Sequence, residues 1–308
     1  MSHQQTLGTA SGTRAFAFSL LALSNLFWAG NWVTGRALRD AFDPITLNFW
    51  RWLIAALILA PFALPALAGQ RDAIRRSAGL LALLALTGVA LFQSLVYLGL
   101  RTTTTVNAVL LNSSAPLFML LCSWSIERER GTRRQIAGML ISLAGILVIL
   151  SRAKLGNLLQ LEFQSGDAWI LLAMPAWGVY SVLAKRRPPE LGGAVFLFLI
   201  SVAGVLLLAP AFALVALHTP PRWPTTGEAA GVLYVALAAS VGAFLCWNRG
   251  VAIVGANTAG FTLHLLPAFG TVLAMVFLGE VFQTFHAAGI ATILLGVIVA
   301  TRPSTRLI

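Results

Sequence analysis

Long apolar stretches free of Asp, Glu, Lys and Arg alternate with short charged segments along most of the chain. An α-helix rises about 1.5 Å per residue, so about 20 apolar residues cross a hydrocarbon core of about 30 Å. Ten stretches come close to or exceed that length: 15–35, 52–70, 77–100, 102–126, 135–151, 168–184, 191–221, 229–248, 250–279 and 281–301. The pattern predicts an all-α integral membrane protein with ten spanning helices.

Prolines and turn-forming residues adjust the bounds of three of these helices. Proline is tolerated in the first turn of a helix, so the second helix is expected to begin at Pro44, which places Arg51 inside that span. The seventh stretch is expected to become a loop over 210–221, which is rich in proline. The ninth opens through two turn formers, Gly255 and Asn257.

The composition agrees with a lipid environment and adds an orientation. Hydrophobic residues make up 58% of the chain and charged residues only 10%, with a net charge of +11. The basic residues are scattered between apolar stretches, so they form no continuous surface for a nucleic-acid backbone. With the N-terminus in the cytoplasm, 14 of the 21 Lys and Arg residues fall on that side and 6 on the other. This bias predicts that both termini are cytoplasmic.

Sequence signatures of membrane enzymes and of ATP-driven pumps are missing. There is no HExxH motif, no glycine-rich phosphate loop and no pair of carboxylates inside a span. Cys122 and Cys246 each lie in an apolar stretch without a second ligand at metal spacing, which predicts buried thiols and no metal or cofactor. The first stretch is too long for a signal-peptide core and is counted as a span. An integral membrane enzyme stays open as an alternative to a transport protein.

The chain is similar to itself when shifted by about half its length. At a shift of 151 residues Gly99 falls on Gly250, and at a shift of 149 Trp28 falls on Trp177. The prediction is two five-helix halves, 14–152 and 166–302, with short tails at 1–13 and 303–308. Because five spans per half is odd, the second half must enter the membrane from the opposite side, which is typical of secondary transporters. A hydrated chamber is then expected between the halves, unless the duplication made a bundle without a pathway.

Both halves resemble the EamA repeat of the drug/metabolite transporter superfamily, over residues from about 15 to 302. The resemblance is carried by a tryptophan followed by small residues, an arginine early in the second helix, and a fourth helix with a central proline and a terminal glutamate: Trp28–Asn31, Trp177–Tyr180, Arg51, Pro116, Glu129, Pro267 and Glu280. The seventh span departs from this pattern because no arginine there matches Arg51.

The resemblance implies a function that composition and spacing do not show. It implies export of aromatic and other neutral amino acids, or related metabolites, across the bacterial inner membrane by alternating access. It also implies a basket-like packing in which helices 1, 3, 4, 6, 8 and 9 line the central cavity. The rival functions are efflux of lipophilic cations, for which a carboxylate inside the membrane is expected, and carriage of a nucleotide sugar, for which more Lys and Arg are expected in the cavity.

Polar and aromatic side chains in mid-span are the candidates for substrate binding, because a polar group in hydrocarbon needs a partner or water. They are Asn25, Trp28, Gln93, Tyr97, Asn112, Ser114, Trp177, Tyr180, Trp247, Phe261 and His264. Pro116 disturbs the carbonyl of Asn112, four residues earlier, and this carbonyl is a candidate for binding a charged group. His264 titrates near neutral pH and is a candidate for proton coupling. Ordinary helix packing and a neutral, hydrogen-bonded histidine remain the alternatives.

A second set of residues is assigned to structure or gating: Arg51, Pro116, Pro267, Gly138, Gly145, Gly289 and Gly296. Arg51 is expected to be structural, pairing with backbone carbonyls or reaching the membrane interface, and substrate binding stays open as its alternative role. The paired glycines permit close helix approach, either within a repeat or in a dimer. A monomer is expected, with a dimer left open. Glu129 and Glu280 are expected to anchor loops.

Overall fold

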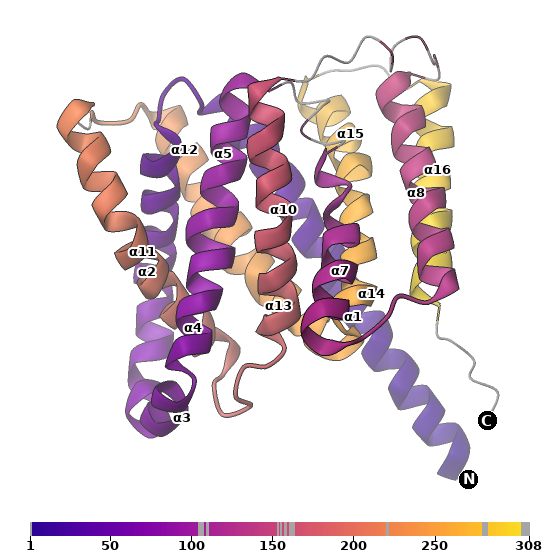
Figure 1. The fold of residues 1–308 in the computed structure, drawn as a ribbon, viewed down its shortest axis with the longest axis horizontal. Helices are drawn as coiled ribbons and strands as arrows, with labels where there is room; N and C mark the ends of the chain where they lie inside the picture. The colour runs from indigo at the N-terminus through magenta and orange to yellow at the C-terminus, as the bar shows by residue number, and fades with distance from the viewer. Residues whose placement is uncertain are drawn as a thin grey trace.

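The computed structural model describes residues 2–103, 108, 111–152, 154, 156, 159, 164–219, 222–278 and 283–302, and no strand occurs among them. The helices stand side by side in a bundle (Figure 1). Their bounds are α1 Ser2–Ala37, α2 Pro44–Leu67, η1 Ala68–Gln70, α3 Arg71–Arg76, α4 Ala78–Leu84, η2 Ala85–Leu91, α5 Phe92–Thr102, α7 Ala115–Glu127, α8 Arg133–Ser151, α10 Ser165–Ala184, α11 Gly193–His218, α12 Thr226–Tyr234, η3 Val235–Gly242, α13 Ala243–Val254, α14 Ala256–Gly260, η4 Phe261–His264, α15 Leu265–Leu278 and α16 Thr284–Thr301.

Seven of these helical segments are long and apolar enough to cross a bilayer. They are Gly12–Ala37, Pro44–Arg76, Ala78–Thr102, Ser165–Ala184, Gly193–His218, Thr226–Val254 and Thr284–Thr301. The predicted fourth, fifth and ninth spans fall on α7, α8 and the combined α14, η4 and α15. The bundle is therefore all-helical and membrane-spanning, and the number of ten crossings stays a prediction.

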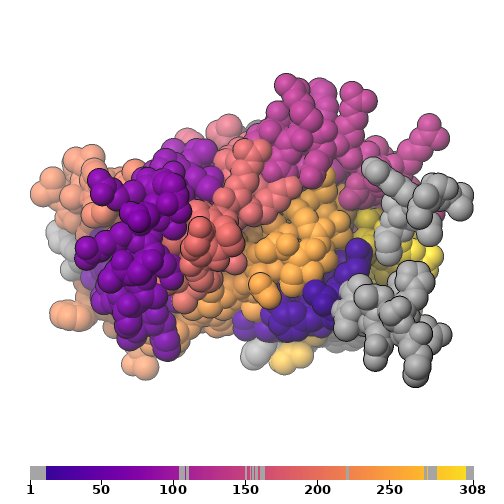
Figure 2. Space-filling model, turned by 90° about the horizontal axis from the view of Figure 1, so that it is seen from below, coloured from indigo at the N-terminus to yellow at the C-terminus, as the bar shows by residue number. Residues whose placement is uncertain are grey.

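Large apolar side chains cover the outside of the bundle. Leu57, Phe62 and Leu206 lie in mid-helix and expose 64%, 70% and 67% of their surface. Such exposure is unfavourable in water but favourable against lipid tails. Seen from one end of the bundle, segments from the two halves of the chain alternate (Figure 2).

Helix bounds confirm one detail of the sequence analysis and correct another. α2 begins at Pro44, and the Asp43 side chain caps it by accepting a hydrogen bond from the Ile45 N–H. α11 runs unbroken to His218 with Pro210 inside it, so the loop expected there is wrong. Membrane helices tolerate proline because neighbouring groups satisfy the freed backbone. α1 begins at Ser2, ahead of the first predicted span, and the tail bounds stay a prediction.

The two central prolines lie near the start of new helical segments. Pro116 is the second residue of α7, directly after a turn at 113–114. Pro267 is the third residue of α15, directly after the 3-10 turn η4. Gly255 separates α13 from α14 with φ +82, a conformation that favours glycine. The fourth and ninth helices are therefore interrupted just before their prolines. These prolines are not in mid-helix, as the sequence suggested, because proline has no backbone N–H to donate and its ring clashes with the carbonyl four residues earlier.

Helix packing follows a regular scheme across the bundle. α1 packs against α13 and α15, whereas α10 packs against α5 and α7. α2 packs against α11, and α8 packs against α16. The pair α8 and α16 lies at one side of the bundle (Figure 1). Each of these pairs joins a helix of the first half to a helix of the second, so the halves share one core.

The glycines singled out in the sequence make the contact between α8 and α16. A Cβ atom on Gly138 would lie 2.5 Å from the Gly296 carbonyl oxygen, and one on Gly145 would lie 2.7 Å from that of Gly289. The Ser142 hydroxyl donates across this contact to the carbonyl of Ile293, at 3.1 Å. The glycine faces therefore pack the two halves together, and neither packing within a repeat nor a dimer describes them. The contacts also show that α8 and α16 run antiparallel.

Candidate functional site

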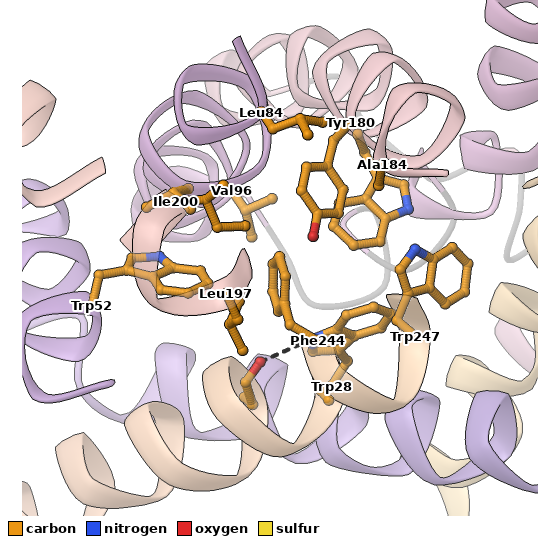
Figure 3. Packing of buried hydrophobic residues seen from close by; sticks show 14 of the residues in the cluster. Trp28, Trp52, Leu84, Val96, Tyr180, Ala184, Leu197, Ile200, Phe244 and Trp247 are labelled. Carbon is orange, nitrogen blue, oxygen red and sulfur yellow. Dashed lines mark hydrogen bonds between the residues drawn. The ribbon is translucent and has the colours of Figure 1, made fainter. Parts of the chain in front are cut away.

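A cluster of aromatic rings fills the centre of the bundle (Figure 3). The rings of Trp28 on α1 and Trp177 on α10 meet edge to face, with centroids 5.0 Å apart. Trp247 on α13 lies 5.3 Å from Trp28 and 5.4 Å from Trp177. Phe244 and Tyr180 extend the cluster, with 5.5 Å between their centroids. Two tryptophans from matching positions of the two halves thus form the middle of the molecule.

A small cavity of about 20 Å³ adjoins these rings. It is lined by Trp28, Asn31, Trp32, Phe92, Gln93, Val96, Asn112, Trp177, Leu263 and Leu266. A space of this size holds about one water molecule. The hydrated chamber expected from the sequence is therefore only a small cavity in this conformation. For an amino acid to fit, the aromatic rings beside the cavity must move apart. Three amide side chains and several rings face that space.

Two π-helical turns lie beside the aromatic cluster at matching positions of the halves. They are η2, Ala85–Leu91, and η3, Val235–Gly242. Wide turns of this kind interrupt the regular backbone ladder and are frequent at functional sites. The Trp28 indole N–H donates to the Ala239 carbonyl in η3, at 3.1 Å, and the Asn48 amide donates to the Val89 carbonyl in η2, at 3.0 Å. Side chains of α1 and α2 thus fix both turns.

Arg51 is completely buried and is held by uncharged groups. Its Nε donates to the hydroxyl of Ser240 in η3, at 2.7 Å. Its Nη1 donates to the Tyr97 hydroxyl at 2.9 Å and to the Asn31 amide oxygen at 3.3 Å. The expectation that Arg51 pairs with backbone carbonyls or reaches the interface is therefore wrong, because side chains of three other helices enclose it.

A related hydrogen bond occurs in the second half. The Tyr180 hydroxyl donates to the Asn248 amide oxygen at 2.9 Å, just as the Tyr97 hydroxyl donates to that of Asn31 at 2.9 Å. The repeat shifts place Asn31 on Tyr180 and Tyr97 on Asn248, so the two partners are exchanged between the halves. One such pair lies on each side of the central tryptophans.

Polar contacts close both ends of the central helices. At one end Arg36 donates to the carbonyls of Leu100 and Thr103, at 2.7 and 2.8 Å. At the other end Lys185, which the repeat aligns with Arg36, pairs with Glu127 and with Glu129. Glu129 also accepts from the Ser123 hydroxyl, as expected of a loop anchor. Glu280 lies outside the described residues.

The predicted site residues fall into three groups by position. Trp28, Gln93, Asn112 and Trp177 line the cavity. Tyr97, Tyr180 and Trp247 are buried directly behind it. Four others are not among the residues that line the cavity: Asn25, Ser114, Phe261 and His264. Asn25, Phe261 and His264 contact other helices, whereas the Ser114 hydroxyl donates to the Leu111 carbonyl of its own turn.

His264 is buried and bonded to the opposite half. Its Nε2 lies 3.1 Å from the carbonyl oxygen of Ser113, which is its own counterpart at a shift of 151 residues. Because a carbonyl oxygen only accepts hydrogen bonds, Nε2 carries a proton in this contact. His264 therefore links the fourth and ninth helices in this conformation.

The sequence analysis missed several residues of this region. Asn31, Phe92 and Val96 line the cavity, and Phe244 contacts three of the tryptophans. The spacing of Trp32 from Trp28 on one helix face predicted a cavity wall, and Trp32 does line the cavity. Phe244 had a signal as well, since it aligns with Gln93 in the repeat. Both cysteines are free and half-buried.

Comparison with known proteins agrees with this architecture. Residues 15–151 and 164–302 each match the EamA-like transporter family. The chain belongs to this family. The resemblance drawn from Trp28, Arg51 and the paired prolines is thereby confirmed.

Individual relatives span nearly the whole EamA chain. An uncharacterized transporter of Archaeoglobus fulgidus is 27% identical over 92% of this chain and 96% of its own length. A probable terminal-alkyne amino-acid exporter of Streptantibioticus cattleyicolor is 29% identical over 92% of each chain. A crystal structure with 22% identity has a TM-score of 0.69 over 94% of this chain and 96% of its own, which shows a shared fold.

Proposed function

We propose that this EamA protein exports neutral amino acids, aromatic ones among them, across a bacterial inner membrane by alternating access without ATP. One observation carries the proposal. The matching indoles Trp28 and Trp177 meet in the centre, beside a cavity faced by the amides of Asn31, Gln93 and Asn112. Rings and amides together suit a solute that has both an apolar side chain and polar groups.

The packing supports two halves of inverted topology, which alternating access requires. The antiparallel contact of α8 with α16 joins equivalent helices. The contact between Gly99 and Ile170 repeats as the contact between Gly250 and Leu21, with the halves exchanged. Arg14 near the start of the first span donates to the carbonyl of Thr301 at the end of the last, at 3.1 Å. This bond supports an even number of crossings, with both ends of the chain on one side of the membrane. The bias of Lys and Arg residues favours the cytoplasm as that side.

Export of lipophilic cations is the rival within transport. Stacked rings suit a cation, but the positive guanidinium of Arg51 lies 5.4 Å from the ring centroid of Trp52, which packs against Phe244 of this cluster. A buried positive charge repels a cation in a medium of low dielectric. The relative from S. cattleyicolor, whose name describes an amino-acid exporter, favours the amino-acid proposal as well.

A counterflow assay tests the proposal. Purified protein is reconstituted into liposomes loaded with one unlabelled amino acid, and uptake of the labelled compound is followed without ATP at two external pH values. We expect saturable uptake that internal substrate accelerates, with aromatic and branched amino acids among the best. Rates equal to those of protein-free liposomes for every amino acid contradict the proposal. Saturable uptake of tetraphenylphosphonium in place of amino acids favours the rival.

A further inference from the structure

Arg51 is the one charged side chain of the described residues that is completely buried in the bundle. It is the eighth residue of α2, which begins a membrane-spanning segment at Pro44. A charged group at such depth is costly and is usually found with a partner of opposite charge or in a pathway for solutes. The surroundings of this guanidinium therefore indicate what it is for.

No carboxylate of the described residues compensates Arg51. Its partners are the hydroxyls of Ser240 and Tyr97 and the amide oxygen of Asn31. None of the ion pairs formed among the described residues includes it. Its Nη2, which carries two N–H groups, is buried without a hydrogen-bond partner. The site thus has a full positive charge and unused donors, but only neutral acceptors.

The unused donors lie close to the cavity. The Asn31 amide oxygen accepts from both the Arg51 Nη1 and the Tyr97 hydroxyl, and Asn31 is itself a wall of the cavity. Gln93, one helical turn before Tyr97, is another wall. The neutral amide oxygen of Asn31 thus accepts from the guanidinium and from the Tyr97 hydroxyl at once. Asn31 is also the side chain that separates these donors from the cavity.

The fold does not need an arginine at this position. The repeat aligns Arg51 with Ile200 on α11, and Ile200 is completely buried in the second half. An apolar side chain therefore serves the packing of the equivalent helix. Because the first half has a charged residue where the second has isoleucine, the centre of the bundle is asymmetric. Such asymmetry is expected of a site that binds one end of a solute.

We infer that Arg51, with Tyr97 beside it, binds the carboxylate of the transported solute. A carboxylate offers about four acceptor positions and matches the fork of a guanidinium, so it supplies both the missing charge and the missing acceptors. The solute's apolar side chain then lies against Trp28 and Trp177. The inference rests on the proposed function and names the group by which that site orients its substrate.

Ligand-induced thermal stabilisation of the purified protein tests the inference apart from transport. The ligands are phenylalanine, 3-phenylpropionate, which keeps the carboxylate but lacks the amine, and phenylalanine amide, which lacks the carboxylate. We expect the wild type to bind both acids at least about tenfold more tightly than the amide. In Arg51→Gln this preference should disappear, whereas Arg51→Lys should keep part of it because the positive charge remains.

Arg36→Gln is the matched control, because the hydrogen bonds of Arg36 to the described residues go to backbone carbonyls at a helix end. It should keep the wild-type preference for acids. The melting temperature without ligand separates misfolding from recognition, and Arg51→Lys provides a second variant if Arg51→Gln does not fold. A wild type that no acid stabilises, or an Arg51→Gln protein that still prefers acids to the amide, overturns the inference. Binding of acids without counterflow of any amino acid refutes the proposed function and leaves this inference standing.

Discussion

Substituting Gly145 with alanine tests whether the contact between α8 and α16 holds the two halves together. The added Cβ would lie 2.7 Å from the Gly289 carbonyl oxygen and 2.7 Å from the Ile293 backbone nitrogen. Both are backbone atoms, so no side-chain rotation relieves the clash and the helices must move apart. Such overpacking costs about 1 to 3 kcal/mol.

Separation of these helices also weakens a hydrogen bond. The Ser142 hydroxyl donates to the Ile293 carbonyl at 3.1 Å, next to the site of substitution. Bonds of this kind between membrane helices contribute about 0.6 kcal/mol on average. We therefore expect Gly145→Ala to lower the free energy of unfolding by about 2 to 4 kcal/mol.

Unfolding in mixed micelles with increasing dodecyl sulfate measures this change. Gly79→Ala is the matched control, because a Cβ on Gly79 meets nothing within 4 Å. That variant should remain within about 0.5 kcal/mol of the wild type. If Gly145→Ala and Gly79→Ala unfold together with the wild type, the close antiparallel contact of α8 with α16 is refuted.

Three further predictions concern the central site. Trp177→Phe should keep the fold and slow amino-acid counterflow at least about tenfold, because a smaller ring loses part of its contact with solute; wild-type rates would remove Trp177 from the site. Tyr97→Phe should lower thermal stability more than Tyr180→Phe, because Tyr97 bonds both Arg51 and Asn31 whereas Tyr180 bonds only Asn248; equal melting temperatures would contradict this. His264→Gln should leave the pH dependence of counterflow unchanged, because the ring is bonded to the Ser113 carbonyl and is not among the residues that line the cavity; a pH-independent variant of a pH-dependent wild type would instead assign proton coupling to His264.

Part of the candidate site could be read from the sequence. Trp28 and Trp177 are large side chains at equivalent positions of a repeat, and duplicated helices carry equivalent residues to the same depth. Gln93 and Asn112 are polar groups in mid-span, where an amide needs a partner or a cavity. These four residues do line the space at the centre. Phe261 and His264 fit the same pattern but contact other helices. The sequence could not show this, because helical periodicity does not reveal which neighbouring helix a face meets.

Hydropathy and internal similarity by themselves determined the class of this protein. A helix is the one conformation that satisfies the backbone of an apolar stretch of about 20 residues in lipid, so the helical class followed from local sequence. The family followed from the resemblance of both halves to the EamA repeat. Only the tertiary structure decided the environment of Arg51, the depth of the central cavity and the partners of the paired glycines. These depend on which helices meet across the bundle, and contacts such as that of Gly145 with Gly289 join residues more than a hundred positions apart.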